Sequence, residues 1–232
     1  MKIFIRSFQG IERPDICELF KQGHVKVLAD YGILNITSNN NKWMEMSNVF
    51  VVVALNEDRS KLLGGVRVHI ADGKEPLPLE SAIGKMDERI YSIIKNHMNN
   101  GTGEICALWN AKEVAGLNIS LLLIRAGISI VNQIKLSSLF TICADYTMPM
   151  VKRVGFTVEN SIGKNGEFVY PNENYIARVL KRLNAVTLEL AEVEDKNRMF
   201  SLRNEPTQLF TEVGKKGNID VDYNLILSNF DK

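Results

Sequence analysis

Two apolar, β-branched segments joined by a short polar segment restrict the fold of this chain more than any other feature. Residues 48–55 (NVFVVVAL) and 63–70 (LGGVRVHI) each predict a buried strand, and the NEDRSKL segment between them has hairpin length. Further strands are predicted at 103–109 and 138–144, with an apolar helix at 119–131 between them. This order predicts an α/β (α+β mixed) chain whose mixed, mostly antiparallel sheet has helices on both faces. It argues against a doubly wound dinucleotide fold, which repeats identical βαβ units.

The other elements follow from the same patterns. Residues 2–8 alternate as a half-buried strand does, and Pro14 opens a helix. A helix is predicted over 81–98, a short helical segment over 145–154, and strands after Gly155 and Phe156. Residues 187–193 and 218–227 are interpreted as extra strands or as a partner-binding tail.

Composition excludes several classes of protein. The 28 basic and 27 acidic side chains nearly cancel, so no basic excess predicts nucleic-acid binding. Three distant cysteines lack metal-ligand spacing, so no metal is expected. The odd cysteine and the short apolar run at the N-terminus favour a cytoplasmic protein without a secretion signal. Every apolar run is interrupted by charges or prolines, so no membrane span is expected.

The stretch from 104 to 156 carries the most information about function. EVAGLN (113–118) follows a central strand and opens the apolar helix, and VKRVGF (151–156) closes the stretch. This order resembles the GNAT superfamily of acyltransferases, with Gly116 on the first glycine of its Arg/Gln-x-x-Gly-x-Gly/Ala loop and Asn118 on the second small residue. The resemblance implies a GNAT-like domain over residues 1–183. Residues 184–232 form a C-terminal extension of unknown role that could pack on the same domain.

The resemblance also implies a phosphate site in this loop. Free N–H groups at a helix start and the helix dipole favour an anion, and glycine permits close approach. The bound group would be the phosphate of acyl-CoA, acetyl-CoA or an acyl-phosphopantetheine carrier, with pantetheine between splayed strands near 104–110 and 138–144. The residues assigned to this site are Trp109, Lys112, Val114, Ala115, Gly116, Leu117 and Asn118. Core packing is the alternative for Trp109.

Two positions depart from the family pattern. Glu113 stands where the family has Arg or Gln, and Lys112 is expected to offset its charge. Val151 stands where the family has the tyrosine that acts as general acid. Tyr146, about one helical turn earlier, is the predicted substitute, and its alternative is a tyrosine packed with its hydroxyl at the surface.

A narrower resemblance concerns GGVRVH (64–69), LPLE (77–80) and GEICALW (103–109). These segments are similar to the acyl-homoserine-lactone synthases and the N-acyl amino acid synthases, whose matching arginine and glutamate fall on Arg67 and Glu104. Ala107 departs from an arginine that often follows. The resemblance implies that Arg67 binds substrate; a surface or paired arginine is the alternative.

Aminolysis of a thioester needs a neutral amine, donors for the oxyanion and a proton source for the thiolate. Glu104 is the predicted general base, with a solvated strand-end carboxylate as the alternative. The three histidines, His24, His69 and His97, lack partners at ligand spacing and are interpreted as surface or satisfied side chains.

The sequence therefore predicts an N-acyltransferase that moves an acyl group from acyl-CoA or acyl carrier protein to the amine of a small molecule or amino acid. The transfer is expected to be direct, in a ternary complex, in a monomer or homodimer. The alternatives are a non-catalytic acyl-CoA-binding or regulatory domain of the same fold, and an unrelated α/β module whose tail recruits a partner.

Overall fold

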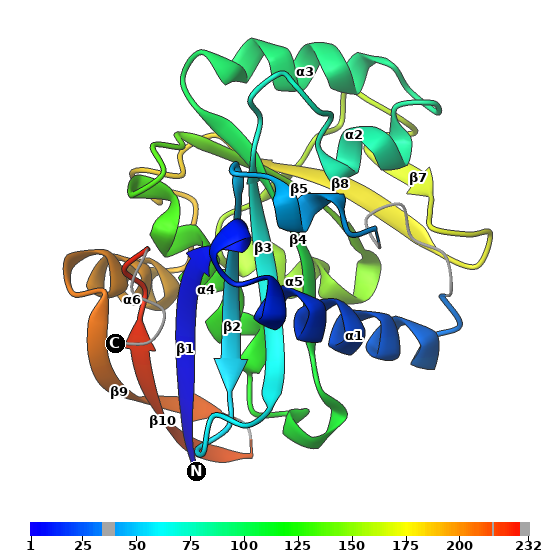
Figure 1. Cartoon of the computed structure of the whole chain (residues 1–232). Helices are drawn as coiled ribbons and strands as arrows, with labels where there is room; N and C mark the ends of the chain where they lie inside the picture. Colours follow the sequence, from blue (N-terminus) through cyan, green and yellow to red (C-terminus); the bar gives the residue numbers. More distant parts are fainter. Residues whose placement is uncertain (34–39, 215, 228–232) are drawn as a thin grey trace.

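The computed structural model describes residues 1–33, 40–214 and 216–227, and these residues build one ten-stranded mixed sheet (Figure 1). Along the sheet the strand order is β6-β8-β5-β4-β3-β2-β1-β10-β9, and β7 pairs with β8. The strands are β1 (Lys2–Gln9), β2 (Val49–Leu55), β3 (Leu62–Ile70), β4 (Thr102–Asn110), β5 (Ser138–Ala144), β6 (Thr157–Val158), β7 (Glu167–Val169), β8 (Ile176–Arg182), β9 (Thr207–Gly214) and β10 (Gly217–Asn224). Neighbours β4 and β5 are parallel, as are β1 and β10, whereas the β1–β2–β3–β4 run is antiparallel.

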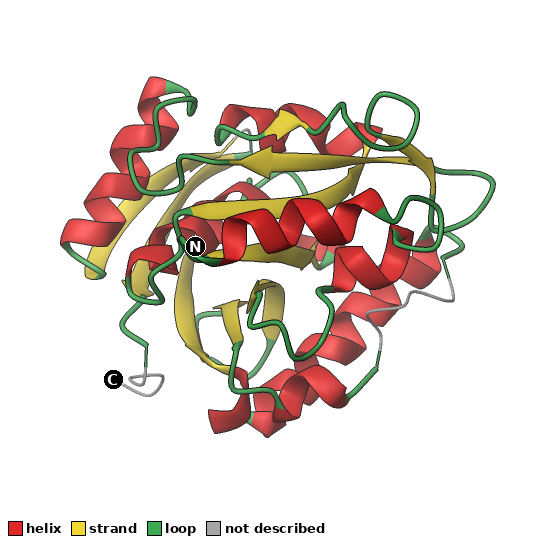
Figure 2. Cartoon of the chain, turned by 90° about the horizontal axis from the view of Figure 1, so that it is seen from above, coloured by secondary structure: helices red, strands yellow, loops and turns green. Residues whose placement is uncertain are grey.

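Helices cover both faces of this sheet, as the sequence predicted (Figure 2). The α-helices are α1 (Pro14–Asp30), α2 (Pro78–Ile83), α3 (Arg89–Met98), α4 (Ile119–Ser129), α5 (Met148–Arg153) and α6 (Val193–Asn204). Short 3-10 turns lie at η1 (Gly10–Glu12), η2 (Lys42–Glu45), η3 (Lys112–Val114), η4 (Ile130–Asn132) and η5 (Asp145–Thr147).

Two apolar layers hold the sheet between the helices. On the α1 face, Phe20 packs against Trp43 and Trp109 with ring centroids 5.9 Å apart in both pairs. On the other face, α4 is buried almost all round, as its apolar sequence predicted. A third cluster lies under α2 and α3, where Ile83, Ile90 and Ile94 meet Phe140 of β5.

Two predicted elements were wrong. The helix predicted over 81–98 is broken into α2 and α3, because the chain turns at Gly84 and Asp87 accepts a hydrogen bond from the amide of Arg89 (3.1 Å). Met86, placed on the apolar stripe, is 54% exposed in this break. No strand forms over 187–193; Leu188 has a positive φ of 57° and α6 begins at Val193.

The C-terminal segment extends the same sheet. Strand β10 pairs in parallel with β1, from Lys2 opposite Asp220 to Arg6 opposite Asn224, and β9 forms the sheet edge beyond it. Helix α6 packs against α4, where Asp195 of α6 is fully buried and forms an ion pair with Arg125. The segment thus completes both the sheet and one apolar layer.

Candidate functional site

A cleft opens where β4 and β5 separate. The two parallel strands pair only from Thr102 to Glu104 and from Ser138 to Phe140, although both continue for several residues. Beyond this point a β-bulge interrupts the pairing of β4 with β3, and Ala107 takes a positive φ of 50°. Because a bulge bends its strand, it accounts for the separation of β4 from β5. The sequence predicted splayed strands here, and the structure confirms them.

The cleft holds a cavity of about 190 Å³. Its walls are mostly apolar and come from both strands, from α1 and α4, and from the segment around the Tyr170–Pro171 cis peptide. Residues that line it from the two strands are Glu104, Ile105, Cys106, Ala107, Leu108, Thr141, Ile142, Cys143 and Ala144. Past Glu104 and Phe140, the facing edges of β4 and β5 offer backbone groups that a bound chain with amide groups can pair with.

Glu104 lies at the point where the two strands part. Its side chain is fully buried, so the alternative of a solvated strand-end carboxylate was wrong. Its Oε2 accepts a hydrogen bond from the amide of Leu79 (2.7 Å), while Oε1 has no hydrogen-bond partner among the described residues. Burial raises the pKa of this carboxyl to about 8, against the lowering effects of the Leu79 amide and Arg67. Near neutral pH the side chain therefore mostly carries its proton.

Two tyrosines that line the cavity, Tyr146 and Tyr175, both contact Tyr31 of the segment after α1. Tyr146 lines it and stacks on Tyr31, with ring centroids 6.0 Å apart and planes 12° apart. Tyr175, which also lines the cavity, donates a hydrogen bond from its hydroxyl to the Tyr31 carbonyl (2.6 Å). Tyr146 is 64% exposed, and partial burial, followed by the neighbouring Tyr31 and Tyr175, raises the pKa of its hydroxyl. Val151 also lines the cavity, so the family's tyrosine position does face it.

The loop after β4 has the backbone geometry expected of an anion site. Gly116 has a φ of +88° and Asn118, the residue before α4, has a φ of +61°. Both positions favour glycine or asparagine, because a Cβ is strained there. Buried Val114 anchors the loop in the core beneath α4. In the first turn of α4 the amide of Leu121 donates to the Asn118 carbonyl (2.9 Å), and the amides of Ile119 and Ser120 lie at the open N-terminal end of the helix.

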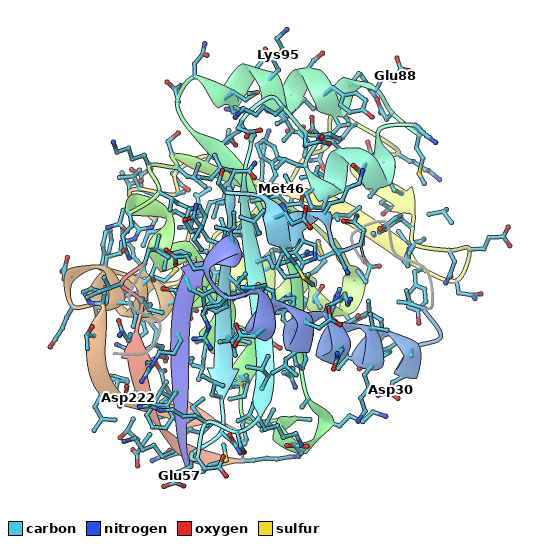
Figure 3. All side chains as sticks on the ribbon, viewed as in Figure 1. Asp30, Met46, Glu57, Glu88, Lys95 and Asp222 are labelled. Atoms are coloured by element: carbon cyan, nitrogen blue, oxygen red, sulfur yellow. The ribbon has the colours of Figure 1, made fainter. Side chains whose placement is uncertain are left out.

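The charges of this loop differ from the prediction. Glu113 is offset by Lys61, whose ammonium lies 2.7 Å from its carboxylate, and not by Lys112. Lys112 instead pairs with Asp30 over 3.0 Å, at the C-terminal end of α1 (Figure 3). The sequence could not show this, because both partners come from other elements.

Lys216, just before β10, and Val213 of β9 lie against the loop. A Cβ at Gly116 would lie 2.7–3.1 Å from three side-chain carbons of Lys216. The amide group of the Asn118 side chain donates a long hydrogen bond to the Val213 carbonyl (3.4 Å). An additional cation from the C-terminal segment thus lies beside the candidate phosphate site, which sequence order alone could not predict.

The remaining predicted residues lie elsewhere. Trp109 packs in the α1 layer so closely that a Cβ at Gly23 would lie 2.1 Å from its ring, which agrees with the core alternative. Arg67 is 2% exposed, with its guanidinium carbon 4.4 Å from the centroid of the Trp43 ring. It lines a second cavity of about 160 Å³, and Pro78 lines both cavities.

The interpretation of His69 as a surface or satisfied side chain was wrong. His69 is 3% exposed, and its Nε2 has no hydrogen-bond partner in the described part of the chain. It lies directly opposite Glu104 in the β3–β4 pairing and lines the second cavity with Arg67. The alternation of Arg67 and His69 on a predicted strand was the signal that could have placed the two side chains on one face.

Two further observations concern the described residues as a set. Among them, no helix combines the length and the apolar character that crossing a membrane requires. Nowhere in residues 1–33, 40–214 and 216–227 do three His, Cys, Asp or Glu side chains gather in a way that could hold a metal ion.

The large, mostly antiparallel sheet with helices on both faces and a splayed β4–β5 pair is a GNAT-like fold, as the sequence predicted. The solved structure of FeeM, an N-acyl amino acid synthase from uncultured soil microbes, is similar with a TM-score of 0.64 and 13% identity over 84% of this chain and 98% of that chain. BjaI, a CoA-dependent acyl-homoserine lactone synthase solved with SAM and isopentyl-CoA, has a TM-score of 0.57 and 12% identity over 95% and 94%. An acyl-CoA N-acyltransferase from Pseudomonas aeruginosa has a TM-score of 0.55 and 10% identity over 78% and 99%.

At these identities the similarity shows the fold. This similarity in fold confirms the predicted resemblance in fold to the N-acyl amino acid and acyl-homoserine-lactone synthases. No protein-family model matches the chain, and no curated protein sequence matches it.

Proposed function

We propose that this protein is an N-acyltransferase that takes its acyl group from acyl-CoA or from an acyl carrier protein. The observation that carries the proposal is the cleft between β4 and β5, with a cavity at its base and a helix-opening loop at the end of β4. The pantetheine arm would lie between the strands and pair with their unpaired edges. The acyl group would occupy the apolar cavity.

The loop at 112–118 would bind the phosphates of the donor. Gly116 allows a phosphate to approach the backbone, and the amides at the start of α4 favour negative charge there. The Lys216 side chain lies directly against Gly116 and would supply a cation beside the phosphate. A carrier protein presents a single phosphate and CoA presents three, so comparing the two donors tests how much of this charge is used.

The acceptor would be a small amine or an amino acid. Arg67 is a buried cation in the second cavity, and it suits an acceptor that carries a carboxylate. In the transfer, the amine nitrogen attacks the thioester carbon, the C–N bond forms, the C–S bond breaks and the sulfur leaves as a thiolate. Glu104, at the base of the cleft, is one candidate for the proton transfers of this reaction. Tyr146, which also lines the cavity, is another candidate for proton donation.

Binding and turnover test this proposal in two steps. Thermal unfolding with acetyl-CoA, a long-chain acyl-CoA and free CoA should show a higher Tm with at least one acyl-CoA; no shift with any of them argues against the donor site. Thiol release with a panel of amines then separates an enzyme from a non-catalytic acyl-CoA-binding domain of the same fold, which would show the Tm shift without amine-dependent release. Gly116→Trp should abolish the shift if the loop is the phosphate site.

A further inference from the structure

A buried base and a buried acid lie on neighbouring strands, between the second cavity and the cavity in the cleft. His69 of β3 and Glu104 of β4 are direct cross-strand neighbours, so their side chains are on the same face of the sheet. His69 lines the second cavity, and Glu104 lines the cavity in the cleft. The pair therefore lies between the space assigned to the acceptor and the space assigned to the acyl group.

Each of these two side chains keeps one buried polar atom without a partner. Nε2 of His69 and Oε1 of Glu104 have no hydrogen bond among the described residues. Leaving a buried polar group unpaired costs about 1–3 kcal/mol, and such groups in folded proteins meet an ordered water, an ion or a bound molecule, or serve the chemistry of a site. Two of them on adjacent strands, beside two cavities, indicate that a ligand group completes them.

The protonation states of the two groups complement each other. Burial, with a smaller effect from Arg67, holds the pKa of His69 well below its usual value, so the imidazole is neutral near neutral pH. Glu104, with its raised pKa, mostly carries a proton under the same conditions. The neutral imidazole has a nitrogen that can take up a proton in passing to solvent, while the burial and the Arg67 charge that lower its pKa make a lasting imidazolium costly. The glutamic acid has a proton to donate, which reverses the role predicted for Glu104.

We propose that His69 is the proton acceptor for a small, carboxylate-bearing amine bound in the second cavity, and that Glu104 is the proton donor to the leaving thiolate. This inference rests on the proposed acyltransferase function. The ammonium group loses one proton to Nε2 of His69, and the neutral amine attacks the thioester carbon. As the C–S bond breaks, the sulfur takes the proton of Glu104. The amide nitrogen releases its remaining extra proton, and the imidazolium and the carboxylate return to their starting states through solvent, so the protons balance.

The second cavity has room for a small amine. Its volume of about 160 Å³ leaves room for a short amino acid. Arg67 would pair with the carboxylate of that molecule. Because Arg67 and His69 are two residues apart on β3, their side chains lie on the same face, and the amine end would then lie near Nε2 of His69. Met46, at the upper end of the sheet in Figure 3, also lines this space.

Two isosteric probes separate a proton-accepting role from a structural one. β-Alanine carries a basic amine that is charged near neutral pH, whereas aminooxyacetate replaces one methylene by oxygen and is weakly basic, so its nitrogen is already neutral. We expect His69→Gln to slow thiol release with β-alanine by about 100-fold and to slow it with aminooxyacetate by no more than a few-fold. The ratio of the two rates within one variant does not depend on how much of the protein is folded.

His97→Gln is the matched control, because His97 packs against Phe140 with ring centroids 5.6 Å apart and lines neither cavity. It should leave the ratio unchanged. An equal fall with both probes in His69→Gln would show a structural role, and no fall with either would remove His69 from the reaction. If wild-type protein releases thiol with other amines and with neither probe, the assignment of the second cavity to carboxylate-bearing amines is wrong. If no amine gives release, the proposed function itself fails.

Discussion

Replacing Glu104 by glutamine removes the ability of this buried side chain to ionise while keeping its shape. Glu104 has no exposed surface, and burial raises the pKa of its carboxyl from 4.5 to about 8. Glutamine retains an oxygen that can accept the hydrogen bond from the Leu79 amide. The substitution therefore isolates the free energy needed to ionise a carboxylate in the cleft.

The pKa shift determines both the sign and the size of the effect. The folded protein holds the Glu104 proton more tightly than the unfolded chain does, so the stability from this group is complete below about pH 4.5 and declines as the pH rises to about 8. One pKa unit corresponds to about 1.4 kcal/mol. Between about pH 5.5 and pH 7.5, the wild-type protein should lose about 2.5 kcal/mol of unfolding free energy relative to Glu104→Gln.

Urea unfolding of both proteins at these two pH values measures this difference. The control is Glu57→Gln, at the exposed turn between β2 and β3, which lies at the opposite end of the sheet from Met46 in Figure 3. It should show no pH-dependent difference from the wild type. A free-energy difference between Glu104→Gln and wild type that is equal at both pH values would refute the argument that burial keeps Glu104 protonated.

Three further substitutions test the loop before α4 and two buried charged side chains elsewhere in the fold. Gly116→Ala should lower the unfolding free energy by about 1 kcal/mol, because the φ of Gly116 is +88°. The same substitution should weaken CoA binding in a titration, and an unchanged affinity would show that this loop is not part of the donor site. Asp195→Asn should cost about 1.5–3 kcal/mol in urea unfolding, because it removes the charge that pairs with Arg125 and Arg153, while Arg125 keeps Glu212 as a second partner at 3.3 Å. Glu194→Gln, at a side chain 79% exposed, should cost less than about 1 kcal/mol. Arg182→Met should leave stability equal or higher by thermal unfolding, because this fully buried guanidinium has no hydrogen-bond partner among the described residues; a large loss would show that it has an essential one.

Local signals predicted much of the fold and part of the site. The apolar runs at β2, β3, β4 and β5 identified those strands, because burial on both faces leaves a continuous pattern. Gly116 and Asn118 marked the loop, because these residues tolerate the positive φ that each adopts. The same kind of pattern failed over 81–98, where an apolar stripe continued across the break between α2 and α3.

The sequence by itself determined the strands β2 to β5 and the apolar helix α4, and it identified the loop that opens α4. These properties depend on residues within a few positions of one another. Only the tertiary structure decided that His69 is buried opposite Glu104, that Lys61 pairs with Glu113, and that Lys216 lies on Gly116. Each of these contacts joins elements far apart in the chain, and strand register, which depends on how whole faces are buried, places them together.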